Sequence, residues 1–430
     1  MTLQRTILLS MVSVLAAIVP ASLATAQTAT TPAARASAEV AGRHPVLMIS
    51  IDGLRPDAVL QADRHGLRIP VLRDLLKQGS YAQAVVNVNP TVTNPNHTTL
   101  VTGVLPREHG VYNNRPFAAS AKLPPSYSLY AQIKAPTLWG AAKAAGLTTA
   151  SIFWPVTAGA QDIDVNLTDG SSDDDQKIEA DAIDLIAEKR PALLTIHFVS
   201  LDHEEHQSGP FSAEANATLE RLDAIVGRII AEERKVYPDA VVAVVSDHGF
   251  SSLSHQMHLN RALAEGGFIT LSDGPAPTVT AWTAFAWYVG GSAMIVLHDP
   301  QDRQTKARIK AYLQTLAGDP RNGIEGVHTR EEIAGLGLAA EAEFVVAFKA
   351  GYAMGNAFSG PLVTDAKGGG HGAYSTGMLR PEMRSSFFIT GPGIAAGRDL
   401  GVIDIRQVAP TLAEKLKVSL PSANMPPLSL

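Results

Sequence analysis

Carboxylates, imidazoles and one threonine hydroxyl recur in short motifs along the chain, and together they suit a pair of divalent cations. The motifs are Ile-Ser-Ile-Asp52-Gly, Thr93-Asn-Pro-Asn96, Asp202-His-Glu-Glu-His206, Ser-Asp247-His248-Gly and Gly-Gly-Gly-His371-Gly. Because the chain contains no cysteine, its metal ligands must be nitrogen and oxygen atoms. Imidazole with carboxylate favours zinc, although other transition ions fit the same donors. Two adjacent metal ions beside a nucleophile are typical of phosphoryl transfer.

The spacing within each motif indicates where its side chains lie. Asp202 and His206 are four residues apart and share one face of a helical turn, whereas the adjacent Asp247 and His248 fit a loop after a strand. Thr93 has two interpretations that are compatible with each other. It is a nucleophile activated by a metal ion, or it is the N-cap of a helix. A helix N-terminus also offers backbone N–H groups to a phosphate, and Asn96 would add a side-chain donor.

The elements expected around these motifs alternate between strands and helices. We expect buried strands at 44–51, 147–153, 192–199 and 240–245, and helices at 70–78, within 131–146, at 177–190 and at 212–237. This alternation predicts an α/β fold with a mainly parallel central sheet and helices on both faces. Asp52, Asp202 and Asp247 each follow the carboxyl end of an expected strand, and that edge is where sites of open α/β sheets form.

The rhythm of the sequence changes between residues 262 and 365. Glycine, proline and aromatic residues cluster there, followed by an expected strand at 293–297 and a helix at 303–317. We interpret 262–365 as an inserted smaller subdomain within a catalytic domain that covers residues 43–430. The chain after this insertion returns His371 to the sheet edge.

The first 26 residues predict a secretory signal peptide. Arg5 precedes an apolar run at 7–19, and Ala24-Thr25-Ala26 is a small-residue cleavage site before Gln27. The apolar run is shorter than the roughly 20 residues of a membrane-spanning helix, so we expect no stable membrane insertion. Residues 27–42 read as a flexible leader. The sequence therefore predicts a secreted or periplasmic protein, and it leaves the oligomeric state open.

Composition excludes one class of partner. The chain has 430 residues, 46% of them hydrophobic and 18% charged, with a formal net charge of −6. These values are typical of a globular protein with a large core. A nucleic-acid groove would need a concentrated basic face, and none is evident. Anionic small substrates stay possible, because bound metal ions supply local positive charge.

Taken together, the motifs resemble the alkaline phosphatase superfamily and, within it, the nucleotide pyrophosphatase/phosphodiesterase family. The matching segments, which lie between residues 45 and 415, are Asp52-Gly53, Pro90-Thr-Val-Thr93-Asn94-Pro-Asn96-His97, Val101-Thr-Gly103, His109-Gly110, Phe153-Trp154-Pro155, Asp202 with His206, Asp247-His248-Gly249 and His371-Gly372. The resemblance implies an alkaline phosphatase-like domain that hydrolyses phosphodiester or phosphoanhydride bonds of a small molecule.

The resemblance also implies two zinc ions and a role for each motif residue. One zinc would be held by Asp202, His206 and His371. The other would be held by Asp52, Asp247, His248 and the oxygen of Thr93, and Asn96 would contact a phosphoryl oxygen. Thr93 would attack phosphorus and form a phospho-threonine, while the first zinc stabilises the leaving oxygen. Water activated at that zinc would then hydrolyse the phospho-threonine.

One position departs from the family pattern. The residue after the nucleophile is usually aromatic and stacks on a nucleotide base, and here it is Asn94. Stacking is worth about 1–3 kcal/mol per base, so its loss weakens the expectation of a nucleotide substrate. Asn94, Tyr112 and Trp154 are the expected substrate-binding residues, with Trp282 as a further stacking candidate. The run from Thr93 to Asn96 also resembles phosphonoacetate hydrolases.

Other functions remain as alternatives to a phosphodiesterase. Some are enzymes that would use the same metal ions, and one is a binding protein that would not use Thr93 as a nucleophile. A phosphonate hydrolase fits Asn94, and a phosphomonoesterase would need additional cations that no motif supplies. The sequence argues against a sulfatase, because the chain has no cysteine and Thr93 does not lie in a Cys/Ser-x-Pro-x-Arg run. A periplasmic binding protein would need no hydroxyl at all. Among the other histidines, we expect His197 to be a packed core residue and His97 and His109 to be structural.

Overall fold

The apolar run at the start of the catalytic region forms the central strand of a sheet. The computed structural model describes residues 42–169, 172, 174–274, 277–376 and 380–430. Strand β1 (Val46–Ile51) is buried along its whole length and pairs in parallel with β6 (Leu193–Phe198) and β7 (Val241–Val245). The predicted signal peptide at 1–26, and all but the last residue of the predicted leader, lie outside the described residues.

Eight strands form the central sheet, in the order β19-β2-β18-β7-β1-β6-β4-β5. Strands β4 (Thr149–Ile152) and β5 (Val165–Leu167) continue the parallel part beyond β6. On the other side, β18 (Phe387–Thr390) runs antiparallel to β7, followed by β2 (Ser80–Tyr81) and β19 (Arg398–Asp399). The prediction of a mainly parallel α/β fold is confirmed.

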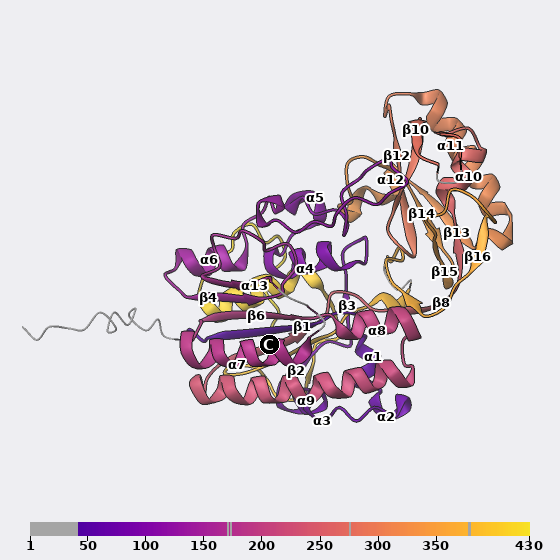
Figure 1. Ribbon diagram of the computed structural model, residues 1–430. Coiled ribbons are helices and arrows are strands. Elements are labelled where there is room, and N and C mark those ends of the chain that lie inside the picture. Colours follow the sequence, from indigo (N-terminus) through magenta and orange to yellow (C-terminus); the bar gives the residue numbers. More distant parts are fainter. Residues whose placement is uncertain (1–41, 170–171, 173, 275–276, 377–379) are drawn as a thin grey trace, which may run out of the picture. The chain divides into compact units, whose positions relative to one another are not determined.

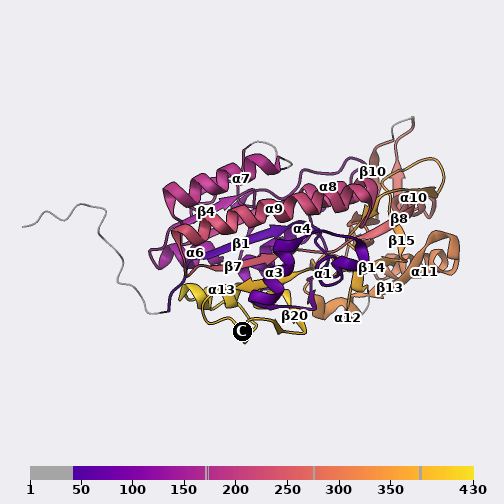
Figure 2. The same cartoon turned by 90° about the horizontal axis from the view of Figure 1, so that it is seen from below.

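Helices cover both faces of this sheet, because successive residues of β1 point to opposite sides. Leu47, Ile49 and Ile51 pack in one apolar cluster with α3 (Pro70–Gln78), α7 (Asp175–Asp184) and α9 (Ala213–Val236). Val46 and Met48 pack in the other with α4 (Thr93–Thr102), α6 (Leu138–Ala144) and α13 (Val408–Leu416). Figure 1 shows α7 and α9 below the sheet and α4, α6 and α13 above it, and Figure 2 looks from the α9 side.

The expected helices and strands differ from the observed ones mainly at their ends. The helix expected within 131–146 is only α6, since residues Tyr130–Gln132 form a separate 3-10 turn and proline 136 precedes the helix. The helix expected at 177–190 is α7, continued by a π-helical turn Leu185–Lys189. Helix α8 (Ser200–Ser208) follows β6 directly and carries the Asp202 motif.

A second sheet occupies most of the region predicted as an insertion. Its antiparallel order is β11-β12-β14-β13, with β11 (Ala284–Tyr288), β12 (Ser292–Leu297), β14 (Ala342–Phe348) and β13 (Ile324–Thr329). Helices α10 (Leu259–Glu265), α11 (Arg303–Gly318) and α12 (Arg330–Ile333) belong to the same region. Strand β8 (Ser251–Met257), which pairs with β15 (Gly351–Met354), β16 (Val363–Asp365) and β17 (Gly369–Gly370), begins before residue 262.

The remaining elements are short. They are α1 (Pro56–Leu60), α2 (Ala62–His65), α5 (Pro106–His109), β3 (Ala84–Val86), β9 (Ile269–Leu271), β10 (Val279–Trp282) and β20 (Val402–Asp404). Among the described residues, no helix is both long enough and apolar enough to cross a membrane. The division of residues 43–430 into a catalytic part and a separate subdomain stays a prediction.

Candidate active site

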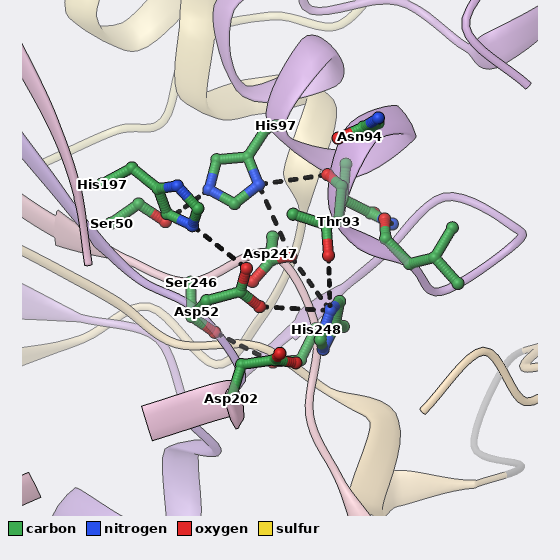
Figure 3. A network of polar contacts seen from close by, with 12 residues as sticks. Ser50, Asp52, Thr93, Asn94, His97, His197, Asp202, Ser246, Asp247 and His248 are labelled. Atoms are coloured by element: carbon green, nitrogen blue, oxygen red, sulfur yellow. Dashed lines mark hydrogen bonds and ion pairs between the residues drawn. The ribbon is translucent and has the colours of Figure 1, made fainter. Parts of the chain in front are cut away.

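The side chains of the separate motifs meet at the carboxyl edge of the central sheet. His248 Nε2 lies 3.2 Å from Asp52 Oδ1, 3.1 Å from Asp247 Oδ2 and 3.4 Å from Thr93 Oγ1. Figure 3 shows the Thr93 side chain directed from α4 toward the His248 ring, which Asp52 also contacts. Strand β1 and strand β7 bring these residues together, because they end side by side in the sheet.

A second group of donors adjoins the first. Asp202 Oδ1 lies 3.6 Å from both His206 Nε2 and His371 Nε2. The imidazole ring of His371 stacks on that of His248, with ring centroids 3.8 Å apart. The structure therefore brings all seven predicted metal-ligating residues into one cluster, in two adjoining groups that share the His248–His371 contact.

Backbone carbonyls fix which ring nitrogen of each histidine faces the cluster. His248 Nδ1 donates to the Gly249 carbonyl at 3.2 Å, His206 Nδ1 donates to Gly369 at 3.1 Å, and His371 Nδ1 donates to Thr91 at 3.3 Å. A carbonyl oxygen can only accept a hydrogen bond, so the proton of each neutral ring is on Nδ1. In every case Nε2 then presents a lone pair to an aspartate oxygen, and two electron-rich atoms face each other.

Burial shapes the electrostatics of the cluster. Burial raises the pKa of the Asp52 carboxyl well above its ordinary value, and the nearby Asp247 and Asp202 carboxylates raise it further. Burial lowers the pKa of His248 to about 4 and places that of His371 well below its ordinary value. Burial alone would raise the pKa of Asp247, but His248 and His97 beside it bring that pKa below its ordinary value. The protein thus holds neutral imidazoles among buried carboxyl groups.

These donors fit divalent cations. Ligand atoms of Asp52, Asp247 and His248 lie within 4.8 Å of one another, and so do those of Asp202, His248 and His371. Asp52 Oδ1 and Asp247 Oδ2 are buried and accept no hydrogen bond from any described residue. A cation between the carboxylate oxygens and the Nε2 lone pairs would remove their mutual repulsion and satisfy the buried oxygens. His206 is outside these two triads but contacts Asp202 from the same side.

Thr93 is the first residue of α4, and Val92 occupies the N-cap position. The N-cap interpretation of Thr93 was therefore wrong, since the hydroxyl points to His248 and not to the helix backbone. The rest of α4 is buried, and its Leu100 and Val101 pack in the same apolar cluster as Val46 and Met48 of β1. The threonine hydroxyl thus faces the cluster of carboxylates and imidazoles.

Asn96 does not lie where sequence reasoning placed it. Its amide oxygen accepts from Val88 N at 3.0 Å, and its Nδ2 donates to the carbonyls of Pro90 and Val92 at 3.1 and 2.9 Å. The residue is completely buried, so its side chain holds the preceding loop on α4 and does not face the cavity beside Thr93. The expected contact with a phosphoryl oxygen is corrected on this ground.

Asn114 also lines the cavity with Thr93, and sequence reasoning missed it. Asn94 N donates to Asn114 Oδ1 at 2.8 Å, which leaves the Nδ2 donors of Asn114 for a ligand. The Asn94 side chain itself donates to the carbonyls of Asn114 and Tyr127 at 3.2 and 3.1 Å. Asn94 therefore lines the same cavity but holds a loop in place, and it offers no stacking face.

The aromatic residues expected to bind substrate lie elsewhere. Trp154 is 2% exposed, packs edge-on against His97, and donates from Nε1 to the His97 carbonyl at 3.4 Å. Tyr112 packs in the apolar cluster around Val92, and Trp282 packs against Phe117. None of these three is among the described residues that line the two cavities of the site. Their placement does not support a substrate contact.

His197 has a role that its apolar strand concealed. It is buried as expected, but its Nε2 lies 3.0 Å from Asp52 Oδ2 and its Nδ1 donates to the Phe153 carbonyl at 3.1 Å. His97 accepts from Ser50 Oγ at 2.8 Å and donates to the Thr93 carbonyl at 3.0 Å. Both histidines therefore hold the residues around the cluster in place.

Two cavities open on the cluster. The nucleophile cavity, about 580 Å³, is lined by Asp52, Thr93, Asn94, Asn114, Arg115, Ser126, Phe153, Pro155, Ser172, His197, Val199, Asp202, His203, His206 and His371. The second cavity, about 350 Å³, shares Asn114, Arg115, His206 and His371 with the first and does not include Thr93. It extends toward β11 of the second sheet, and we call it the adjoining cavity.

Comparison with known protein families places the site in context. Residues 46–374 match the family described as type I phosphodiesterase/nucleotide pyrophosphatase. A human relative, ectonucleotide pyrophosphatase/phosphodiesterase family member 1, is 29% identical over 253 residues, which is 54% of this chain and 26% of that protein. A venom phosphodiesterase of Crotalus durissus collilineatus is 25% identical over 63% of this chain and 34% of that protein. The chain thus spans about a third or less of the length of these relatives.

Solved structures share the fold over nearly the whole chain. Human ectonucleotide pyrophosphatase/phosphodiesterase 5 superposes with a TM-score of 0.66 at 19% identity, covering 89% of this chain and 96% of that one. An inactive variant of the murine protein, solved in complex with AMP, has a TM-score of 0.67 at 20% identity, covering 88% of this chain and 96% of that one. At this level of identity the likeness concerns the fold.

Proposed function

Since the chain belongs to the type I phosphodiesterase/nucleotide pyrophosphatase family, we propose that it is an exported, metal-dependent hydrolase of phosphodiester or phosphoanhydride bonds in small molecules. The observation that carries this proposal is the Thr93 hydroxyl facing a cluster of three aspartates and three histidines, of which all but His206 are largely buried. A binding protein would have no use for a hydroxyl in that position. Binding of AMP by a murine protein of the same fold supports a substrate with a phosphoryl group and an organic substituent.

Two zinc ions are the proposed cofactors. Asp52, Asp247, His248 and Thr93 would hold one, and Asp202, His206 and His371 would hold the other. Bound divalent ions would supply positive charge next to the phosphoryl group and lower the pKa of an oxygen nucleophile. The Nδ1–H donations to backbone carbonyls orient the three imidazoles before any ion arrives, as outer hydrogen bonds commonly do at metal sites.

The proposed reaction consists of two displacements at phosphorus. Thr93 Oγ1 forms a bond to phosphorus, and the bond from phosphorus to the leaving oxygen breaks on the opposite side. The leaving oxygen takes the electron pair of the broken bond. The proton of the Thr93 hydroxyl passes to solvent in this first displacement. A water molecule then attacks phosphorus, Thr93 Oγ1 leaves with the electron pair of its bond to phosphorus and takes a proton from that water, and the phosphoryl product departs. Asn114, oriented by Asn94 N, would donate from Nδ2 to a non-bridging oxygen throughout.

A substrate panel with Thr93 variants tests the proposal. Zinc-loaded protein should hydrolyse a nitrophenyl phosphodiester or a dinucleotide, Thr93→Ala should lose at least about 1,000-fold in kcat, and Thr93→Ser should keep measurable turnover because it keeps the hydroxyl. Acid quenching during turnover should trap phosphate on Thr93, detected by mass spectrometry. Absence of hydrolysis on every substrate, with Thr93→Ala indistinguishable from wild type, would refute the proposal.

The panel also separates the alternatives within the superfamily. A phosphonate hydrolase would act on phosphonoacetate faster than on the diester, and a phosphomonoesterase would prefer a nitrophenyl monoester. Asn94 keeps the phosphonate alternative in the test, because it leaves the cavity beside Thr93 without a stacking ring at that position. Export is tested separately, by sequencing the N-terminus of mature protein, which should begin at Gln27.

A further inference from the structure

The adjoining cavity borders the cluster at His206 and His371 and does not include Thr93. In an in-line displacement the leaving oxygen is opposite the nucleophile. Thr93 lines only the nucleophile cavity, whereas His206 and His371 line both cavities. A phosphoryl group attacked by Thr93 would therefore direct its leaving oxygen past His206 and His371 into the adjoining cavity.

The charges around the adjoining cavity all have one sign. Arg115 and Lys367 line it, and none of its described lining residues is aspartate or glutamate. This contrasts with the whole chain, in which acidic residues outnumber basic ones, 41 to 35. A concave surface with cations and no acids raises the local concentration of anions and discriminates against neutral groups.

Hydrogen bonds fix both the backbone and the side chain of Arg115. Its backbone carbonyl accepts from Trp287 Nε1 at 3.0 Å, and its Nη1 donates to the Pro124 carbonyl at 2.6 Å. These contacts attach the residue to β11 and to its own loop. Arg115 also lines both cavities, next to Asn114, so it lies where the adjoining cavity meets the nucleophile cavity. An arginine fixed in this way loses little side-chain freedom when it binds an anion.

Lys367 is positioned by the loop that delivers His371. Gly368 follows it with φ +78°, and a Cβ there would lie 2.0 Å from the His206 carbonyl, so the loop is seated directly on α8. Lys367 is exposed and lines the adjoining cavity, so its ammonium group is available to a bound anion.

We propose that Arg115 and Lys367 are specificity-determining residues that make this enzyme select substrates whose leaving group carries negative charge, such as a phosphate-bearing group. The inference rests on the proposed function and concerns the leaving half of the substrate, for which no motif residue accounts. It favours phosphoanhydrides over diesters with a neutral leaving alcohol.

Two substrates with the same transferred group test this selectivity. Thymidine 5′-triphosphate and the 4-nitrophenyl ester of thymidine 5′-monophosphate both transfer a thymidylyl group, but only in the first is the leaving group already anionic in the bound substrate, before the bond to phosphorus breaks. For each variant we compare its kcat/KM relative to wild type on the two substrates, which cancels their different reactivity. Arg115→Gln should lose about 10-fold or more on the triphosphate and about 2-fold or less on the ester. Lys367→Gln should show a smaller effect of the same kind, weakened by added salt.

The controls separate charge from folding. Arg115→Lys keeps the charge and should recover part of the triphosphate activity. Lys349→Gln removes an exposed lysine that directly follows β14 and lines neither cavity, and it should leave both activities unchanged. Equal losses on both substrates in Arg115→Gln and Lys367→Gln would overturn this inference while the proposed function stands. Absence of hydrolysis of either substrate by wild type, with no phosphate trapped on Thr93, would instead overturn the proposed function.

Discussion

Hydrogen bonds to the side chains of the cluster matter as much as the ligands themselves. His197 contacts Asp52 Oδ2 and leaves Asp52 Oδ1 directed at His248. Asp52 therefore faces the cluster through one oxygen, because the other is occupied. The same logic applies to His248, His206 and His371, whose outer nitrogens all bond to backbone carbonyls. The cluster is oriented from behind before it meets a ligand.

Removing the support behind Asp52 should weaken metal binding. We expect His197→Leu to reduce zinc affinity about 10- to 100-fold, because Asp52 loses the hydrogen bond that fixes it. Competition with a fluorescent chelator measures this affinity without reference to activity. His255→Leu is the matched control, since His255 stacks on Tyr352 away from the cluster and should leave affinity unchanged. Equal affinity in His197→Leu and wild type would contradict the prediction.

Residue types and their spacing were sufficient to predict the cluster but not the amide that accompanies it. Asn96 and Asn114 are the same type of residue, and only the fold determines that the first is fully bonded to backbone and the second lines the cavity. Likewise, an apolar strand around His197 predicted burial correctly and could not indicate the partner across the sheet. The bonding partners of these individual side chains were the part that a single sequence could not supply.

At the scale of elements, the strands and helices beneath the site were predictable, because their apolar periodicity is strong. Strands β1, β6 and β7 match the expected runs to within two residues at each end. The second sheet was predicted only as a change of rhythm, since its antiparallel strands come from mixed aromatic and polar segments. Helix–loop contacts such as that between α8 and Gly368 have no sequence signature beyond the glycine itself.

The 368–372 loop lies directly on α8, so adding one methyl group at Gly368 should disturb the site. In Gly368→Ala the new Cβ would clash with the His206 carbonyl, so the loop must move and separate His371 from His206. We expect lower zinc occupancy, measured by elemental analysis, and a loss of stability of about 1–3 kcal/mol. Gly360→Ala is the matched control, because Gly360 also has positive φ, +85°, but no atom within 4 Å of the added group. Full zinc occupancy in Gly368→Ala would refute the clash.

Helix α9 carries a buried carboxyl that should make stability depend on pH. Burial raises the pKa of Glu233 to about 7, whereas an exposed glutamate titrates near 4.5. Because the folded-state pKa is the higher one, the folded protein is favoured below pH 4.5 and loses this stability as pH rises through 7. Glu233→Gln should therefore stabilise the protein by up to about 3 kcal/mol at pH 8 and by little at pH 4.5.

Denaturant unfolding at the two pH values measures this difference. Glu232→Gln is the control, since that carboxylate lies on the same helix and bonds to Lys235 at 2.6 Å. It should give no gain that grows with pH. A gain for Glu233→Gln that is the same at both pH values would argue against titration of Glu233.

For the molecule as a whole, removal of metal should lower the stability of the fold. Ions that bind only the folded state stabilise it by about 3 kcal/mol at a 100-fold excess over Kd, so a chelator should lower Tm measurably. Asp52→Asn should affect the stability of the metal-free protein and that of the metal-bound protein differently. Without metal it should unfold no more easily than wild type, because a buried carboxyl near Asp247 and Asp202 is gone. With metal its gain in Tm should be smaller. A chelator that leaves wild-type Tm unchanged would contradict the two-metal proposal.

The chain passes through the whole second sheet between His248 and His371, and this affects the order in which the parts of the site can assemble during synthesis. His248 and His371 stack in the folded protein, yet elements β8 to β17 come between them in the chain. A growing polypeptide can therefore pair β1 with β6 and β7 well before it can close the ring of donors. Cation capture becomes one of the last events of maturation, and the enzyme stays inert until its final third has arrived and settled.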